Sequence, residues 1–132
     1  MANKQQLDED VHISYEDQSK INKFAINNSK LHDIKEEIEL KKKELQNLSD
    51  AIDELLMADE DTVVPFMYGE VFAHLTVENA NEELEKAKET IEKEIKGLES
   101  KQSAIKSLLD GLKVQLYSKF GKKINLEENE DE

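Results

Sequence analysis

The sequence predicts a mostly α-helical protein, in which a long antiparallel two-helix coiled-coil hairpin carries a small β-hairpin at its turn. Three observations lead to this prediction. Two stretches with heptad-spaced leucine and isoleucine occupy most of the 132 residues. A short segment between them concentrates β-branched and aromatic residues. Glycine is rare and Pro65 is the only proline, so few positions interrupt long helices.

The first helix is expected to begin at Ser14. Its hydroxyl can accept a backbone N–H of the first turn, and Glu16 and Asp17 suit the positive end of the helix dipole. Two rows of seam residues follow: Phe24, Leu31, Ile38, Leu45 and Ile52, then Asn27, Ile34, Lys41, Leu48 and Leu55. Such rows are the a and d positions of a coiled coil.

The second helix is expected to begin after Thr76 or Asn79, either of which can cap it. Its two rows are Leu84, Ile91, Leu98, Ile105 and Leu112, then Lys88, Ile95, Gln102, Leu109 and Leu116. Gly121, with lysines on both sides, predicts the end of this helix. Glycine adopts the left-handed cap readily, and cations suit the negative end of the dipole.

The two series match as the facing sides of an antiparallel hairpin. The residue numbers of facing positions then have a constant sum, as for Phe24 with Leu112 and Ile52 with Leu84. Each polar seam residue faces an apolar one, so no layer is polar on both sides. The chain is expected to reverse near Tyr68. The alternative is that each helix pairs with another chain in a parallel coiled coil.

Residues 62–75 are expected to form the β-hairpin, with strands at 63–67 and 70–75. Tyr68 and Gly69 form the predicted turn, because glycine supplies the positive φ that a tight turn requires. An isolated two-stranded hairpin is marginal in water, and its edges are open to pairing. We therefore predict assembly with partner chains through six residues: Val63, Val64, Phe66, Val71, Phe72 and Leu75. The alternative is a plug that folds back on the helices of its own chain.

The two termini are expected at one end of the hairpin, where acidic and apolar residues are interleaved. We divide the chain into a flexible acidic extension over 1–13, the coiled-coil hairpin over 14–121 and an acidic tail over 122–132. A surface that holds exposed apolar segments of other proteins is predicted there. Its residues are Ile13, Tyr15, Ile21, Phe24, Leu116, Tyr117 and Phe120. Alternatively, these side chains only hold the helix ends together and the acidic segments aid solubility.

The composition excludes several classes of function. A net charge of −13 repels nucleic acid and anionic lipid. The chain has no cysteine, its three histidines are far apart, and no apolar run approaches the ~20 residues of a membrane span. It also has no phosphate-binding loop and no nucleophile–base set, so we expect no enzyme, metal or cofactor. A cytoplasmic location follows by default from the absence of an apolar signal core.

Three motifs resemble the prefoldin family, in particular its eukaryotic β-type subunits. The first is Tyr-Glu-Asp-Gln followed by Ile-Asn-Lys-Phe, at residues 15–24. The second is Val-Pro-Phe with Gly-Glu-Val-Phe, at 64–72, where the family more often has Gly-Asp. The third is Leu-Tyr-Ser-Lys-Phe-Gly with Ile-Asn-Leu-Glu, at 116–127. The resemblance covers nearly the whole chain.

The resemblance implies a chaperone hexamer of two α-type and four β-type subunits, with a β-barrel body and coiled-coil arms. It implies that the arm tips bind unfolded actin and tubulin without ATP and pass them to the cytosolic chaperonin. Residues 63–67 and 70–75 would then contribute to the barrel. The helix ends near Phe24, Leu116, Tyr117 and Phe120 would face the client. A coiled-coil scaffold or tether with no client binding is the other function considered.

Overall fold

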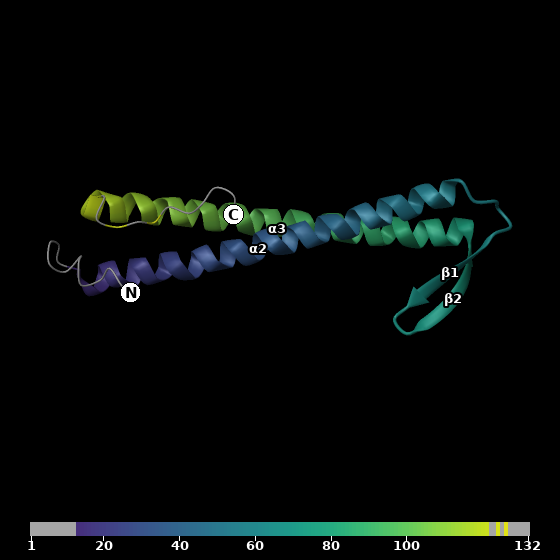
Figure 1. Cartoon of the computed structure of the whole chain (residues 1–132), viewed down its shortest axis with the longest axis horizontal. Coiled ribbons are helices and arrows are strands. Elements are labelled where there is room, and N and C mark those ends of the chain that lie inside the picture. Colours follow the sequence, from purple (N-terminus) through teal and green to yellow (C-terminus); the bar gives the residue numbers. More distant parts are fainter. Residues whose placement is uncertain (1–12, 122–123, 125, 127–132) are drawn as a thin grey trace. The chain divides into compact units, whose positions relative to one another are not determined.

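The computed structural model describes residues 13–121, 124 and 126. Its elements, in chain order, are helix α2 (Tyr15–Leu56), strand β1 (Val63–Tyr68), strand β2 (Val71–Thr76) and helix α3 (Val77–Phe120) (Figure 1). This order confirms the predicted mostly α-helical fold with a β-hairpin between two long helices. Most of the extension predicted over 1–13 and most of the tail predicted over 122–132 lie outside the described residues.

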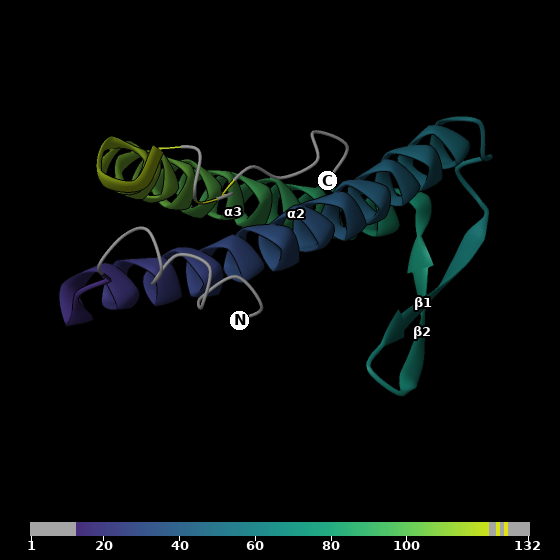
Figure 2. The ribbon, with the colours of Figure 1, turned by 60° about the vertical axis from the view of Figure 1, so that its left-hand side comes forward.

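Two compact units make up the chain. The terminal unit combines residues 1–36 with 100–132, and the central unit contains residues 37–99. In each unit, a segment of α2 runs antiparallel to a segment of α3, as Figures 1 and 2 show. Within the described chain, neither helix combines the length and the apolar character that a bilayer crossing requires.

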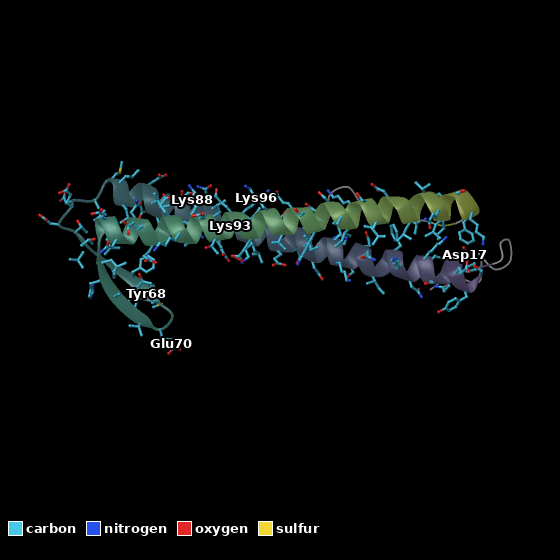
Figure 3. The ribbon with its side chains drawn as sticks, turned by 180° about the vertical axis from the view of Figure 1, so that it is seen from behind. Asp17, Tyr68, Glu70, Lys88, Lys93 and Lys96 are labelled. Carbon is cyan, nitrogen blue, oxygen red and sulfur yellow. The ribbon has the colours of Figure 1, made fainter. Side chains whose placement is uncertain are left out.

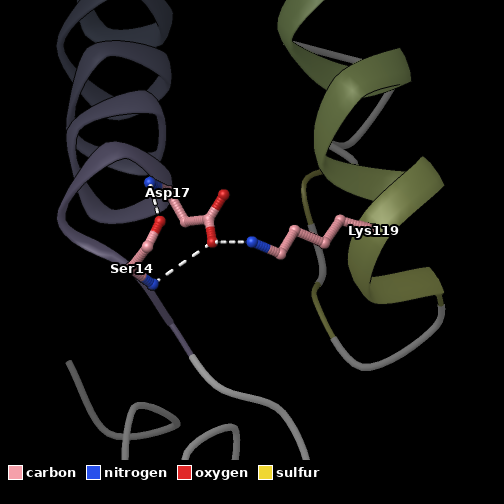
Figure 4. A network of polar contacts seen from close by, with 3 residues as sticks. All are labelled: Ser14, Asp17 and Lys119. Atoms are coloured by element: carbon pink, nitrogen blue, oxygen red, sulfur yellow. Dashed lines mark hydrogen bonds and ion pairs between the residues drawn. The ribbon is translucent and has the colours of Figure 1, made fainter.

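Helix α2 begins with a reciprocal hydrogen-bonded cap. The backbone N–H of Asp17 donates to Ser14 Oγ at 3.1 Å, and the backbone N–H of Ser14 donates to the Asp17 carboxylate at 3.2 Å (Figure 4). This arrangement satisfies two backbone donors that the helix itself leaves unpaired. The predicted helix start at Ser14 is therefore confirmed.

The structure confirms the predicted capping at both ends of helix α3. The backbone N–H of Asn79 donates to Thr76 Oγ1 at 3.1 Å, so Thr76 is the capping residue of the two candidates. The helix ends at Phe120, and Gly121 follows with φ of 58°. This left-handed conformation is the one that glycine adopts at helix C-termini.

The terminal unit is held together by one apolar cluster between α2 and α3. Its buried residues are Ile21, Phe24, Leu31, Leu109, Leu112, Leu116, Phe120 and Leu126. In the central unit, Ile38 and Ile52 of α2 and Ala80 and Ile95 of α3 are buried. Most of these side chains occupy the predicted heptad rows, so the antiparallel pairing is confirmed within each unit.

Strands β1 and β2 pair antiparallel, from Val63 opposite Thr76 to Tyr68 opposite Val71. The predicted turn was one residue too early, because the two connecting residues are Gly69 and Glu70. Gly69 has φ of 61°, and no described residue other than glycine has a positive φ. Glycine at the first position of a two-residue loop is typical of a type II′ turn, which matches the twist of the strands. Tyr68 therefore completes β1.

Candidate interaction surfaces

The β-hairpin has two faces of different exposure, because successive side chains of a strand point to opposite sides. The inner face contains the partly buried Val64, Phe66, Ala73 and Leu75. The outer face contains Val63, Met67 and Phe72, whose side chains are 61%, 53% and 62% exposed. Val71, beside the turn, is also exposed. The six predicted assembly residues are therefore divided between a half-covered face and an open one.

Tyr68 ends the inner face near helix α3. Its ring centroid lies 5.2 Å from that of Phe66, in a tilted arrangement. Burial raises the pKa of the Tyr68 hydroxyl, and the negative charge of Glu83 on α3 raises it further. Figure 3 shows Tyr68 and Glu70 on the hairpin. The inner face thus has some cover from its own chain, whereas the outer face has none among the described residues.

The seven residues predicted at the free end have very different exposures. Tyr15 is 88% exposed and is the only one of the seven that lies open to solvent. Ile21, Phe24, Leu116 and Phe120 are buried in the apolar cluster, and Ile13 and Tyr117 pack against it. The structure therefore brings six of the seven together, but as the interior of the terminal unit.

An ion pair joins the two helices beside this cluster. Lys119 of α3 donates a hydrogen bond to the carboxylate of Asp17, the same group that accepts from the Ser14 backbone (Figure 4). The Lys119 ammonium holds the pKa of Asp17 below its ordinary value, burial opposes this shift, and the Ser14 hydrogen bonds add to it. Sequence analysis missed this pair. The sequence did contain a signal for it. The residue numbers of Asp17 and Lys119 add up to the same value as those of the facing pair Phe24 and Leu112, which places the two residues opposite each other.

A groove of about 600 Å³ lies between the helices of the terminal unit. Tyr15, Lys20 and Lys23 of α2 line one side of it, and Leu108, Gly111 and Gln115 of α3 line the other. The missing side chain at Gly111 leaves this space open, since a Cβ there would have no neighbour within 4 Å. Sequence analysis predicted only Tyr15 among these residues, because lysines and a glycine on a helix face have no distinctive spacing.

Two residues of the predicted acidic tail pack in the apolar cluster of the terminal unit. Leu126 is 7% exposed, and its backbone N–H donates to the Tyr117 hydroxyl at 3.0 Å. Ile124 also packs on the cluster. Leu126 therefore lies beside Tyr117, about one helical turn before the end of α3.

No group of side chains that could hold a metal ion occurs in the part of the chain that the structure describes. The features that remain are an open apolar strand face and a lysine-rimmed groove. Both are open to solvent. The fold defines the class as a helical coiled-coil protein with a partly exposed apolar β-hairpin.

Comparison with known proteins gives the family. The prefoldin subunit family matches residues 18–123. The sequence is 51% identical over 123 residues to Prefoldin subunit 4 of Homo sapiens, covering 92% of each chain. It is 38% identical over 115 residues to Prefoldin subunit 4 of Saccharomyces cerevisiae, covering 87% of this chain and 89% of that one. The chain therefore belongs to the prefoldin family, whose members are chaperone subunits without enzymatic activity.

A comparison of structures also finds a prefoldin subunit. The crystal structure of the prefoldin beta subunit from Thermococcus strain KS-1 matches with a TM-score of 0.74. The match covers 83% of this chain and 96% of that chain, at 23% identity. At this identity the likeness concerns the fold alone, and it includes both long helices with the β-hairpin between them.

Proposed function

We propose that this chain is one subunit of a heterohexamer that it forms with other α-type and β-type prefoldin subunits in the cytoplasm. The complex binds unfolded client proteins, such as actin and tubulin, without ATP and delivers them to the cytosolic chaperonin. The observation that carries the proposal is the open apolar face of the β-hairpin, in a chain whose family forms chaperone subunits.

The hairpin supports assembly for two physical reasons. Val63, Met67 and Phe72 expose apolar side chains on one face of the hairpin, and removal of such side chains from water favours association with a partner. Strands β1 and β2 also each have an outer edge whose backbone groups can pair with a neighbouring strand. A neighbouring hairpin of the same kind satisfies both requirements at once.

The terminal unit is the proposed client-binding part. Tyr15 and the groove beside it offer an exposed aromatic ring, an apolar wall at Leu108 and a hydrogen-bonding rim. We propose direct client contact at Tyr15, with Ile21, Phe24 and Leu116 supporting this surface from beneath. Ile13, Tyr117 and Phe120 remain proposed client contacts when the helix ends separate. One arm binds weakly, and several arms together bind well through multivalency.

The burial of Ile21, Phe24, Leu116 and Phe120, four of the seven predicted residues, favours a second candidate function. In that case the chain is a coiled-coil scaffold or tether, and the terminal cluster only closes the helix pair. The two functions share the same assembly contacts and differ at Tyr15 and the groove.

Assembly is tested by charge substitution on the outer face. Phe72→Lys is expected to abolish copurification with partner subunits, because a buried lysine without a partner is costly. Val114→Lys is the matched control, since Val114 is 70% exposed on α3 and lies outside the hairpin. Equal copurification of both variants contradicts the proposed assembly.

Client binding is tested in the assembled complex with Tyr15→Ala. If Tyr15 contacts the client, the variant complex assembles normally and suppresses client aggregation less well. If the chain is only a scaffold, neither assembly nor suppression of aggregation changes. Ile26→Ala is the control, because Ile26 is an exposed apolar residue on the same helix. Truncation of the helix ends is a poorer test, since it removes Asp17, Lys119 and several cluster residues together.

A further inference from the structure

The part of the chain around the β-hairpin is strongly acidic and has no lysine or arginine. Residues 44–85 contain twelve aspartates and glutamates, and their only basic residue is His74. The described ion pairs of the central unit use lysines outside this stretch: Lys41, Lys86 and Lys93. Most of the net charge of −13 therefore lies in the part of the chain that contains the proposed assembly face.

A pocket of about 540 Å³ lies in this acidic stretch, where the β-hairpin joins the helices. The end of α2, the connection to β1, the last residue of β2 and the start of α3 all contribute to its wall. No described lysine forms an ion pair with the pocket's carboxylates. Its lining combines apolar and acidic side chains: Leu55, Leu56, Val77, Glu60, Asp61 and Glu78.

Asn81, near the start of α3, lines the same pocket and has an unsatisfied acceptor. Its Oδ1 atom is buried and has no hydrogen-bond partner among the described residues. A buried acceptor without a partner destabilises the folded chain. Because Asn81 lies in the wall of the pocket, a donor that enters there can pair with Oδ1 after a small rotation of the amide.

This lining selects one kind of occupant. The carboxylates require a cation, the Asn81 oxygen requires a hydrogen-bond donor, and the apolar walls require an aliphatic segment. Lysine and arginine side chains combine all three, because an aliphatic stem ends in a charged group with several N–H donors. A metal ion does not fit, since the described residues include no group of side chains that could hold one.

The surroundings of the pocket indicate that the basic side chain belongs to a polypeptide. Leu56 and Met57, at the end of α2, are 76% and 90% exposed. Val63, at the start of β1, is 61% exposed and belongs to the proposed assembly face. A neighbouring chain that places a lysine or arginine in the pocket can cover these apolar side chains as well, which a free amine cannot do.

We propose that the pocket receives a lysine or arginine side chain of a neighbouring subunit in the assembled complex. This inference rests on the proposed function, because it requires assembly through the β-hairpin. It also gives a physical reason for mixed assembly. Two copies of this chain bring two acidic faces together, whereas a neighbour with a basic side chain neutralises the pocket.

Competition during assembly tests the proposal. Wild-type chain and a variant of different mass are mixed in equal amounts with a limiting amount of partner subunits, and mass spectrometry gives their ratio in the complex. Glu60→Lys with Asp61→Lys reverses the charge of the pocket. At about 0.05 M salt this variant should be incorporated about tenfold less than wild type, and at about 0.5 M less than threefold, because salt screens the charges.

Glu92→Lys with Glu99→Lys is the matched control. It makes the same change of charge at two exposed positions of α3 outside the acidic stretch, and it should be incorporated like wild type. Phe72→Lys should be excluded at both salt concentrations. Normal incorporation of Phe72→Lys overturns the proposed assembly itself. Exclusion of Phe72→Lys, together with equal incorporation of the pocket and control variants, overturns only the role of the pocket.

Asn81→Leu tests the acceptor separately from the charge. Leucine has a similar size and needs no partner, so the free chain should unfold at the same or a higher temperature. Incorporation into the complex should nevertheless fall about fivefold at both salt concentrations, because the neighbour's N–H loses its acceptor. Incorporation equal to that of wild type overturns the proposal. Circular dichroism of each variant verifies that the helices are folded.

Discussion

The ammonium group of Lys41 on α2 lies 3.0 Å from a carboxylate oxygen of Glu94 on α3, within the central unit. Lys41 occupies a seam position of the heptad pattern, and the neighbour of Glu94 is the buried Ile95. The hydrogen bond with Glu94 raises the pKa of Lys41, against the opposing effect of burial. The aliphatic part of the Lys41 side chain thus lies along the apolar seam, while its ammonium group reaches the edge of the seam.

Replacement of this seam lysine tests how much the ion pair contributes. We expect Lys41→Leu to raise the melting temperature, because leucine fills the seam beside Ile95 and Glu94 is exposed enough to be solvated alone. Thermal unfolding followed by circular dichroism measures the change. Lys42→Leu, at an exposed position of the same helix, should leave the melting temperature nearly unchanged. A lower melting temperature for Lys41→Leu contradicts this interpretation.

The Asp17 carboxylate should make stability depend on pH. Its pKa in the folded chain is below the ordinary value of 3.8, so its ionised form stabilises the fold above about pH 4. This contribution is lost as the pH falls through the folded-state pKa. Asp17→Asn should therefore cost about 1 kcal/mol at neutral pH, a modest value because Lys119 is half exposed.

The measurement is chemical denaturation of both proteins at a series of pH values. The difference between wild type and Asp17→Asn should shrink at acid pH and vanish below the folded-state pKa. A constant difference at all pH values rules out ionisation of Asp17 as the cause.

The apolar cluster should depend most strongly on Leu116, which is 1% exposed. Leu116→Ala leaves a cavity and is expected to lower the free energy of unfolding by about 2–5 kcal/mol. Val114→Ala, two residues earlier on the same helix, removes an exposed side chain and should cost less than about 0.5 kcal/mol. Urea denaturation compares the two. Similar losses for both variants are incompatible with the cluster as described.

The two-residue turn should require glycine at position 69. Gly69→Ala places a side chain at φ of 61° and is expected to cost about 1 kcal/mol, although the added Cβ would meet nothing within 4 Å. Gly97→Ala has equal space but lies within α3, where alanine should stabilise by about 1 kcal/mol. Opposite signs of the two changes in unfolding free energy are the expected result. A neutral or stabilising Gly69→Ala contradicts a strained left-handed turn.

Sequence patterns predicted the elements because each is encoded locally. Ser14 and Thr76 are capping residues, and Gly121 ends α3 through its own backbone freedom. The hairpin turn was misplaced by one residue, because Tyr68 has a strand-forming side chain and Gly69 alone does not indicate which of its neighbours completes the loop.

The candidate sites were harder to predict than the fold. Heptad spacing identifies Phe24 and Leu116 as apolar seam residues, but it does not say whether the seam is closed or open at its end. Closure depends on contacts such as Lys119 with Asp17 and Tyr117 with Leu126, which join residues through the folded chain. The groove beside Tyr15 depends in the same way on the side chains of both helices.

The sequence by itself determined two long helices, their antiparallel pairing and an apolar strand pair between them, because helical periodicity and capping act over a few residues. The tertiary structure decided which apolar residues are available for contact. Phe72 is exposed and Phe120 is buried, although both are aromatic residues in apolar segments. The physical reason is that exposure depends on what neighbouring segments cover, and this is fixed only when the chain packs.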